Sequence, residues 1–224
     1  MTLHDDMIAM GERAVAASRE LARLTAKRKN AILEAMAEGL DKARDDIQAA
    51  NAKDLQAGRK AGLTDAMLDR LELTEARMDG MIKGLRDVAA LADPVGNQIS
   101  SWIRPNGLVI DKLRVPIGVI AIIYESRPNV TADAAGLCFK TANAVILRGG
   151  KEAVHSNRAI ADAMQAGGEE KGLPQSAIQL VDTTDRDAVR ELCQAVGLVD
   201  LVIPRGGESL IRAVSEMAHV PVIK

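Results

Sequence analysis

The chain has 224 residues, of which 47% are hydrophobic and 27% are charged, as is typical of a globular protein with one large domain or two small ones. Its 29 basic and 31 acidic residues are interleaved and leave a net charge of -2, so no cationic face is expected for nucleic acid or anionic lipid. Aromatic residues are only 1% of the chain, which also argues against a platform that stacks single-stranded bases.

Cysteine usage and the N-terminal residues predict a cytoplasmic protein. Cys138 and Cys193 fall within predicted helices and form neither a disulfide framework nor a CxxC pair, which fits a reducing compartment. Residues 1–6 carry two acids where a signal peptide would be basic, and no apolar run reaches ~18 residues, so no membrane span is expected. The three histidines lack ligand spacing, and we predict no metal site.

The first part of the chain predicts a layer of amphipathic helices. Hydrophobic residues recur at helical spacing through residues 3–92. Breaks are expected before Thr25 and Thr74, whose hydroxyls can cap the next helix, and at the turn of residues 62–64. We therefore assign residues 1–97 to an N-terminal helical layer.

An Asn-Gly pair predicts a β-hairpin after the helices. Residues 98–104 and 108–115 alternate on either side of Pro105-Asn106-Gly107, and Asn-Gly between alternating hydrophobic residues is the strongest local hairpin signal. Such a hairpin can protrude and pair with another chain, or it can pack back on its own domain. We assign residues 98–115 to a candidate oligomerisation arm, with Trp102 as a packing anchor.

The next stretch predicts a βαβ unit. Residues 115–124 form a near-continuous β-branched run, which is typical of a strand buried on both faces of a parallel sheet. A polar turn at residues 125–129 follows, then a helix capped by Thr131 or Asp133, then a second strand at residues 144–147. Ligands of such units bind outside the carboxyl ends of the strands, where the polar turns after both strands lie.

Strand and helix patterns continue to alternate up to the last residue. This alternation predicts an α/β fold, a Rossmann-like doubly wound parallel sheet with right-handed crossovers in residues 116–224, preceded by the helical layer and the inserted hairpin. A cap near Thr183 or Thr184 is expected for one helix. The expected helices are residues 152–170, 185–195 and 207–217, and the expected strands are residues 177–181, 198–203 and 220–223.

Two glycine turns follow predicted strands and open predicted helices. They are Arg148-Gly149-Gly150-Lys151 and Arg205-Gly206-Gly207. Backbone N–H groups at a helix N-terminus, with an arginine alongside, can bind an anion such as a phosphate. The chain has no GxGxxG or GxxxxGK[ST] motif, and Gly-Gly can equally serve only to turn the chain. Two such turns at neighbouring strand ends favour a cofactor.

Three stretches carry a family resemblance: VPIGVIAIIYESRPNVTADAAGLCFKTANAVILRGGKEAVHSN, LVIPRGGESLI and the closing VPVIK. With them the chain resembles the gamma-glutamyl phosphate reductases, also called glutamate-5-semialdehyde dehydrogenases, a branch of the aldehyde dehydrogenase superfamily. The resemblance covers only about the first half of the family's usual length. It implies an oxidoreductase of proline biosynthesis, a homo-oligomer when complete, that reduces L-glutamyl 5-phosphate to L-glutamate 5-semialdehyde with NADPH and releases phosphate.

The resemblance also implies roles for individual residues. Asn129 matches the asparagine whose amide helps to form an oxyanion hole. Arg148 and Lys151 would meet a 2′-phosphate with two cations and favour NADPH over NADH. The remaining cofactor-binding residues would be Glu125, Ser126, Arg127 and Pro128 on the nicotinamide side, Gly149 and Gly150 at the adenosine end, and Arg205, Gly206, Gly207 and Ser209 at the pyrophosphate turn.

This sequence departs from the family pattern in its cysteines. Neither Cys138 nor Cys193 matches the family's nucleophile, and each is expected to be a small core residue. The nucleophilic cysteine is expected beyond Lys224, in a catalytic domain absent from these residues, so the chain alone is expected to be inactive. His155 is expected to have a surface or capping role.

Two other functions are compatible with the same residues. One is a nucleotide-binding or assembly module without chemistry of its own, which pairs with a partner through the hairpin. The other is a different aldehyde dehydrogenase relative with another acyl substrate. The SRPNV and PRGGE segments favour the glutamyl phosphate branch, in which Arg127 is a candidate to bind the substrate's carboxylate.

Overall fold

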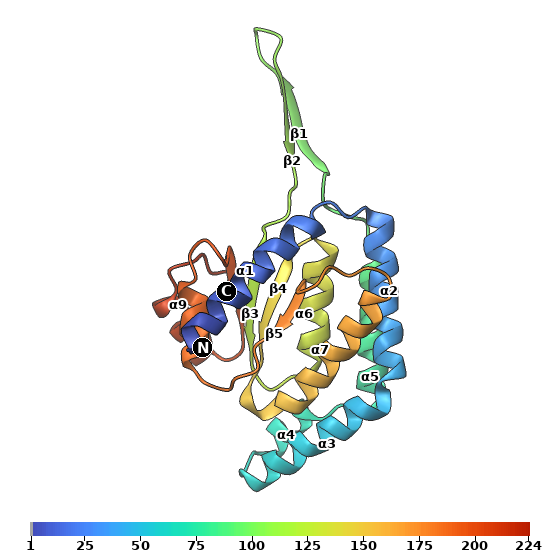
Figure 1. The fold of residues 1–224 in the computed structure, drawn as a ribbon, viewed down its shortest axis with the longest axis vertical. Helices are drawn as coiled ribbons and strands as arrows, with labels where there is room; N and C mark the ends of the chain where they lie inside the picture. The colour runs from blue at the N-terminus through green and yellow to red at the C-terminus, as the bar shows by residue number, and fades with distance from the viewer. Residues whose placement is uncertain (1) are drawn as a thin grey trace.

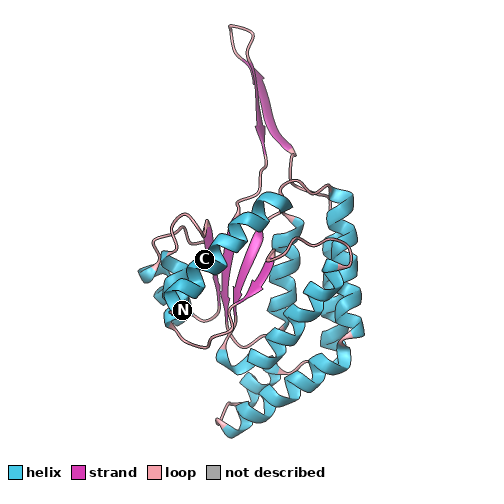
Figure 2. Cartoon of the chain, viewed as in Figure 1, coloured by secondary structure: helices cyan, strands magenta, loops and turns pink. Residues whose placement is uncertain are grey.

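The computed structural model describes residues 2–224, which form helices around a small central sheet, with a hairpin projecting from one end (Figures 1 and 2). None of the helices in this part of the chain is long and apolar enough to cross a membrane. In chain order the elements are α1 (Leu3–Leu21), α2 (Ala26–Lys42), α3 (Arg44–Lys60), α4 (Asp65–Leu71), α5 (Glu75–Ala90), β1 (Gln98–Ile103), β2 (Val109–Leu113), β3 (Val119–Tyr124), α6 (Asn129–Lys140), β4 (Ala144–Arg148), η1 (Lys151–Ala153), α7 (Val154–Glu169), β5 (Ile178–Leu180), α8 (Asp187–Gln194), β6 (Leu201–Arg205) and α9 (Glu208–Met217).

The central sheet has four parallel strands in the order β5-β4-β3-β6. All six residues of β3 are buried, as the β-branched run predicted. Ile123 pairs with Arg148 and Tyr124 pairs with Arg205, so β3, β4 and β6 all end at the same edge of the sheet. The predicted α/β fold with a parallel sheet and a separate hairpin is confirmed.

Helices cover both faces of this sheet. α6 and α7 belong to the right-handed crossovers from β3 to β4 and from β4 to β5, so they lie on one face. α2, α3 and α5 pack on the outside of this pair, whereas α1 crosses the strands and contacts α8 (Figure 1). The first five helices therefore do not form one layer. α2 and α7 touch through Gly39 and Gly167, where a Cβ atom on either glycine would clash with a backbone carbonyl oxygen.

The threonine caps predicted in the helical segment are confirmed. The hydroxyls of Thr25 and Thr74 accept hydrogen bonds from the third backbone N–H of α2 and α5. Thr64 caps α4 in the same way. The break at Ala43 between α2 and α3 was not predicted, because that junction has no side-chain cap and no glycine or proline.

β3 starts later than predicted, at Val119 rather than Val115. The backbone N–H groups of Ile117 and Gly118 donate to Oδ1 of Asn143, at 2.7 and 2.9 Å, and Gly118 has a φ of +127°. These N–H groups are therefore unavailable to the sheet. The positive φ at residue 118 favours glycine there. Long-range contacts, rather than the apolar run, decide where the strand begins.

α6 starts earlier than predicted. Its first residue is Asn129, with Pro128 in the N-cap position, so neither Thr131 nor Asp133 caps it. The side chain of Thr131 turns into the interior instead. Proline suits this place because it has no backbone N–H to leave unpaired at the start of a helix.

Three predictions near the C-terminus also need correction. The hydroxyl of Thr183 accepts from the backbone N–H of Asp185 in the loop, and α8 starts without a side-chain cap. β6 lies two to three residues later than predicted. Residues 220–223 form no strand, because a single bridge between Val222 and Val202 is all that joins them to the sheet.

The hairpin projects away from the rest of the chain (Figure 2), so of the two predicted arrangements it has the protruding one. Trp102 is 43% exposed and lies opposite Ile110, so it is not an anchor to the body of this chain. The hairpin and the segment after it expose a set of large apolar side chains: Ile99, Trp102, Ile103, Leu108, Val109, Leu113, Val115 and Ile117.

A buried ion pair holds the chain at the base of the hairpin. Nζ of Lys29 in α2, which is 1% exposed, lies 2.7 Å from the carboxylate of Asp93. Nearby, Nζ of Lys140 at the end of α6 donates to Asn30 and to the backbone carbonyl of Ala89. The two lysines thus tie α2 and α6 to the segment from which the hairpin emerges.

Candidate functional site

Three hollows lie along the carboxyl edge of the sheet, where the polar turns were predicted. We name each by one lining residue: the Asn129 hollow of about 410 Å³, the Gly206 hollow of about 680 Å³ and the Lys151 hollow of about 450 Å³. Together they contain most of the predicted site residues.

The three hollows form one row, because adjacent hollows have lining residues in common. Arg70 and Arg127 line both the Asn129 hollow and the Gly206 hollow. Glu125 and Glu152 line both the Gly206 hollow and the Lys151 hollow. A ligand with several connected groups can therefore extend from one end of the row to the other.

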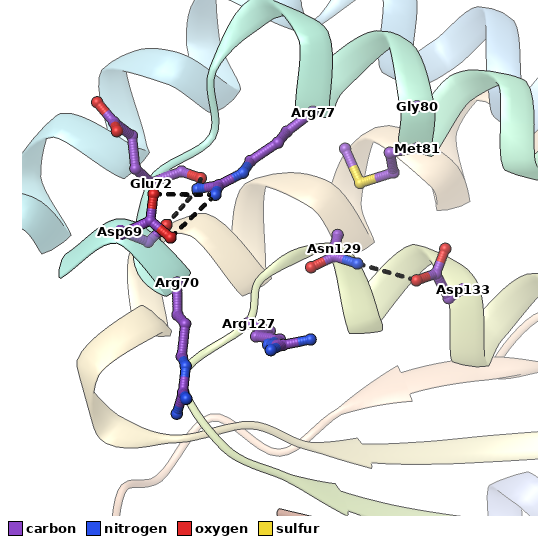
Figure 3. A pocket seen from close by; sticks show the side chains of 9 residues that line it. All are labelled: Asp69, Arg70, Glu72, Arg77, Gly80, Met81, Arg127, Asn129 and Asp133. Carbon is purple, nitrogen blue, oxygen red and sulfur yellow. Dashed lines mark hydrogen bonds and ion pairs between the residues drawn. The ribbon is translucent and has the colours of Figure 1, made fainter. Parts of the chain in front are cut away.

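The Asn129 hollow lies between the start of α6 and the α4–α5 segment (Figure 3). Nδ2 of Asn129 donates a hydrogen bond of 3.0 Å to Oδ2 of Asp133, one helical turn later. A primary amide has two N–H donors, so one remains available. Desolvation raises the pKa of the Asp133 carboxyl above its ordinary value, and the hydrogen bond from Asn129 opposes that rise.

The opposite wall is held by Arg77. Its guanidinium donates to both carboxylate oxygens of Asp69, at 3.1 and 3.2 Å, and to the backbone carbonyls of Asp69 and Glu72. The contacts to both carboxylate oxygens come from one nitrogen, Nη2, while Nη1 donates to the carbonyls, and together they hold the end of α4 against the start of α5. Within residues 2–224, Arg70 and Arg127 form no ion pair.

Beneath Asn129, three buried side chains form a hydrogen-bonded chain. The hydroxyl of Thr131 donates to Oδ1 of Asn157 at 3.0 Å and lies 2.7 Å from the hydroxyl of Tyr124. Burial raises the pKa of Tyr124, so its hydroxyl stays protonated. These contacts join the end of β3, the first turn of α6 and the start of α7, and thus set the position of Asn129.

The Gly206 hollow contains the second glycine turn. Oε2 of Glu125 accepts from the backbone N–H of Gly207 at 2.9 Å. A Cβ atom at Gly206 would lie 2.6 Å from Cδ of Glu125, so a larger residue there would displace this side chain. The Glu125 carboxylate thus occupies the start of α9, where a phosphate was predicted, and stabilises the helix terminus.

The Lys151 hollow has an apolar wall and a polar rim. Val189 of α8 and Leu210 and Met217 of α9 provide apolar surface, and Lys151 and Arg186 supply cations. Ser209 also lines this hollow rather than the pyrophosphate turn.

Arg148 lines the same hollow, but its guanidinium is occupied. It is 9% exposed and donates to the backbone carbonyls of Gly149, Thr184 and Asp185. Burial lowers its pKa, although the group keeps its charge under ordinary conditions. Arg148 therefore connects the end of β4 to the loop that carries Arg186.

Two other predicted residues lie outside the row. Gly149 lines a separate, smaller hollow beside Asn157, and Pro128 is buried at the start of α6. The other predicted site residues lie together in the row and include Glu125, Ser126, Arg127, Gly150, Arg205, Gly206 and Gly207.

Sequence reasoning missed several charged residues that line the row, among them Arg70, Asp133, Glu152 and Arg186. Arg70 belongs to a helix that only tertiary packing brings to α6. Glu152 and Arg186 adjoin the predicted turn and a predicted helix, but no motif distinguishes them from surface charges.

Neither cysteine lies in the row. Both are buried, as predicted, and burial raises the pKa of Cys138 to about 12 and of Cys193 to about 11. Thiols in such surroundings are poor nucleophiles. The described residues also contain no group of three or more His, Cys, Asp or Glu side chains that could hold a metal ion.

Comparisons with known proteins show the family and the fold. The aldehyde dehydrogenase family profile matches residues 3–224. The crystal structure of gamma-glutamyl phosphate reductase from Thermotoga maritima is 41% identical over 97% of this chain and 53% of its own, with a TM-score of 0.95. The corresponding enzyme from Saccharomyces cerevisiae is 32% identical over 96% of this chain and 55% of its own, with a TM-score of 0.89.

A more distant structure shares the fold. An NAD-dependent benzaldehyde dehydrogenase from Corynebacterium glutamicum is 20% identical, with a TM-score of 0.80 over 99% of this chain and 45% of its own. The chain thus spans about half the length of the solved structures that it matches.

The buried hydrogen-bonded chain under Asn129 predicts that the loss of one hydroxyl group will lower the stability of the fold. Thr131→Val removes the hydroxyl that joins Tyr124 and Asn157, and should lower the free energy of unfolding by about 1–3 kcal/mol, because two buried polar groups lose a partner. Thr131→Ser keeps the hydroxyl and is the matched control. Urea unfolding curves that coincide for the two variants would contradict this role.

Proposed function

The chain belongs to the aldehyde dehydrogenase family, and we propose that it forms the cofactor-binding part of an enzyme that reduces L-glutamyl 5-phosphate to L-glutamate 5-semialdehyde with NADPH. The row of hollows carries this proposal, because it places an amide donor at one end and cations at the other along a single strand edge. The names of the two reductases that are 41% and 32% identical support the substrate class.

Asn129 is proposed to act on the reacting carbonyl. Its second amide N–H would donate to the carbonyl oxygen as negative charge develops, which stabilises the transition state by about 3 kcal/mol in comparable sites. The nucleophile is proposed to be a cysteine outside residues 1–224, since both cysteines of this chain are buried away from the row. Bound NADPH would supply the hydride.

The Lys151 hollow fits the adenosine end of the cofactor. Its wall of Val189, Leu210 and Met217 suits the faces of an adenine ring. Lys151 and Arg186 at the rim would pair with a 2′-phosphate, which favours NADPH over NADH. Arg148 would act indirectly, by holding the loop that carries Arg186 through the carbonyls of Thr184 and Asp185.

The Gly206 hollow lies between the two ends and fits the pyrophosphate. The glycines allow close approach to backbone N–H groups at the start of α9. A bound phosphate would compete with the Glu125 carboxylate for the N–H of Gly207. Glu152, which lines both neighbouring hollows, is placed to accept hydrogen bonds from ribose hydroxyls.

The hairpin is proposed to be an assembly arm in a homo-oligomer. It leaves Trp102, Ile103 and Val109 exposed in this chain, and large apolar side chains on a projecting hairpin suit an interface. Its strands also leave unpaired edges for another chain.

The reductase proposal predicts phosphate-dependent reduction of NADP⁺ by L-glutamate 5-semialdehyde in a protein that contains both this chain and the proposed cysteine. Asn129→Ala should lower kcat by about 10²–10³-fold, because the carbonyl oxygen loses a donor. The reaction is followed by absorbance at the NADPH band, and the isolated 224-residue chain should show none. Equal rates with and without phosphate in the wild type would contradict the proposal.

The cofactor assignment predicts selective loss of NADPH binding. Lys151→Ala and Arg186→Ala should each weaken NADPH binding by about tenfold, since each removes a charge-assisted contact, and should leave NADH binding unchanged. Fluorescence titration of the purified chain measures both ligands. Lys171→Ala, an exposed lysine in the turn after α7, is the control. A parallel loss of NADH affinity would remove these residues from 2′-phosphate recognition.

The assembly proposal predicts that the hairpin surface controls the oligomeric state. Replacing the exposed indole in Trp102→Ser should weaken self-association by at least about tenfold, because a central aromatic residue usually contributes most to an interface. Sedimentation equilibrium measures this change. Val196→Ser alters a side chain that is 69% exposed elsewhere on the chain and serves as the control. Unchanged association constants for Trp102→Ser would contradict the assignment of the hairpin as an assembly arm.

A further inference from the structure

We propose that the Asn129 hollow binds the α-amino acid end of the substrate, with Asp133 pairing with the α-ammonium group and Arg127 with the α-carboxylate. The inference rests on the proposed function, since it assigns the part of the glutamyl substrate that the same site holds. Asp133 and Arg127 would then be specificity-determining residues, whereas Asn129 acts on the reacting carbonyl.

The charges of the hollow match a zwitterion. Asp69 and Arg77 neutralise each other on one wall, where Nη2 of Arg77 donates to both carboxylate oxygens of Asp69. On the other wall, Figure 3 shows Arg127, Asn129 and Asp133 close together, whereas the side chain of Arg70, which also lines the hollow, extends away from Asn129 and Asp133. One cation and one anion therefore lie beside the amide. A ligand with a single charge would leave one of these two groups unpaired. A free α-amino acid end satisfies both.

The Asp133 carboxylate retains capacity for a ligand. It accepts one hydrogen bond, from Asn129, whereas a carboxylate has about four lone-pair sites. Within residues 2–224 it forms no ion pair. Asp133 is exposed at the mouth of the hollow, so a ligand can reach its carboxylate. Partial desolvation raises the pKa of this carboxyl, and the hydrogen bond from Asn129 opposes the rise.

Arg127 is similarly available. It precedes Pro128 in the turn after β3, lines the hollow, and forms no ion pair within the described chain. Its planar fork of donors matches a carboxylate in two parallel hydrogen bonds. Glu72 also lines the hollow, but Figure 3 shows its carboxylate directed away from Asn129, so we do not assign it to the ligand.

The length of the glutamyl chain fits this arrangement. The carbonyl carbon and the α-nitrogen are separated by four bonds of about 1.5 Å, so they lie at most about 5 Å apart. Asn129 and Asp133 are in direct contact at 3.0 Å, and the hollow encloses about 410 Å³. A carbonyl at the free N–H of Asn129 therefore leaves the ammonium group within reach of Asp133.

Binding of stable esters to the purified 224-residue chain tests the inference. The probes are L-glutamate γ-methyl ester, monomethyl glutarate, which lacks the amino group, and methyl 4-aminobutyrate, which lacks the α-carboxylate. Isothermal titration calorimetry should show the wild type binding the glutamate ester at least about tenfold more tightly than either analogue, because each analogue loses one charge-assisted contact.

Two variants should separate the contacts. Asp133→Asn keeps an oxygen acceptor for the amide of Asn129 but removes the charge, so it should weaken the glutamate ester about tenfold and leave monomethyl glutarate unchanged. Arg127→Gln should weaken both carboxylate-bearing esters and leave methyl 4-aminobutyrate unchanged. Glu72→Gln, a charge change in the same hollow on the side chain that points away, should alter none of the three.

Three results would overturn the inference. They are equal affinities of the wild type for all three esters, no binding of any ester, and equal weakening of glutamate ester and monomethyl glutarate by Asp133→Asn. The last result would mean that Asp133 only orients Asn129. NADPH titration of the same samples keeps the proposed function separate, since its failure in the wild type contradicts the cofactor role whatever the esters do. Unfolding temperatures of the variants report whether each one is folded.

Discussion

The buried hydrogen bonds among Tyr124, Thr131 and Asn157 are the constraint on which the site depends. Buried polar groups must pair with each other, so these three side chains fix the relative positions of the elements that carry them. Asn129 lies two residues before Thr131 on α6. Gly149 lies against the amide of Asn157, with no room for a Cβ atom. The two turns that follow β3 and β4 are therefore held in place by one shared network.

The charged groups of the site divide into those that hold the chain and those that remain available. Arg148 donates hydrogen bonds to backbone carbonyls, and Glu125 accepts one from the N–H of Gly207, so both hold the chain. Both belong to the most recognisable motifs of the sequence. The cations at the rim of the row, such as Arg186, lie beside those motifs. Residues that build a turn and residues that meet a ligand are thus often neighbours rather than the same.

Local physical signals predicted most of the fold. Thr25 and Thr74 cap helices because a threonine hydroxyl satisfies a free N–H wherever a helix begins. Asn106-Gly107 forms the hairpin turn for a similarly local reason, because Gly107 has the positive φ that such a turn requires. The start of β3 was not predictable, because the side chain of Asn143 lies 25 residues away from the N–H of Gly118 that it binds. The candidate site shows the same limit, since Arg70 and Asn129 are distant in sequence and line one hollow only in the folded chain.

The relation between Asn129 and Asp133 shows why this site is built on a helix. Residues four apart lie on one face, about 5–6 Å between Cβ atoms, and backbone hydrogen bonds hold that spacing. In the proposed site, a donor for the carbonyl and an acceptor for the ammonium group would then be separated by a fixed length, as they would not be on a flexible loop. A shorter or longer substrate chain would satisfy only one of the two at a time. If the proposed site holds, helix geometry would convert the length of the substrate into selectivity, and the buried network beneath α6 keeps that helix in place.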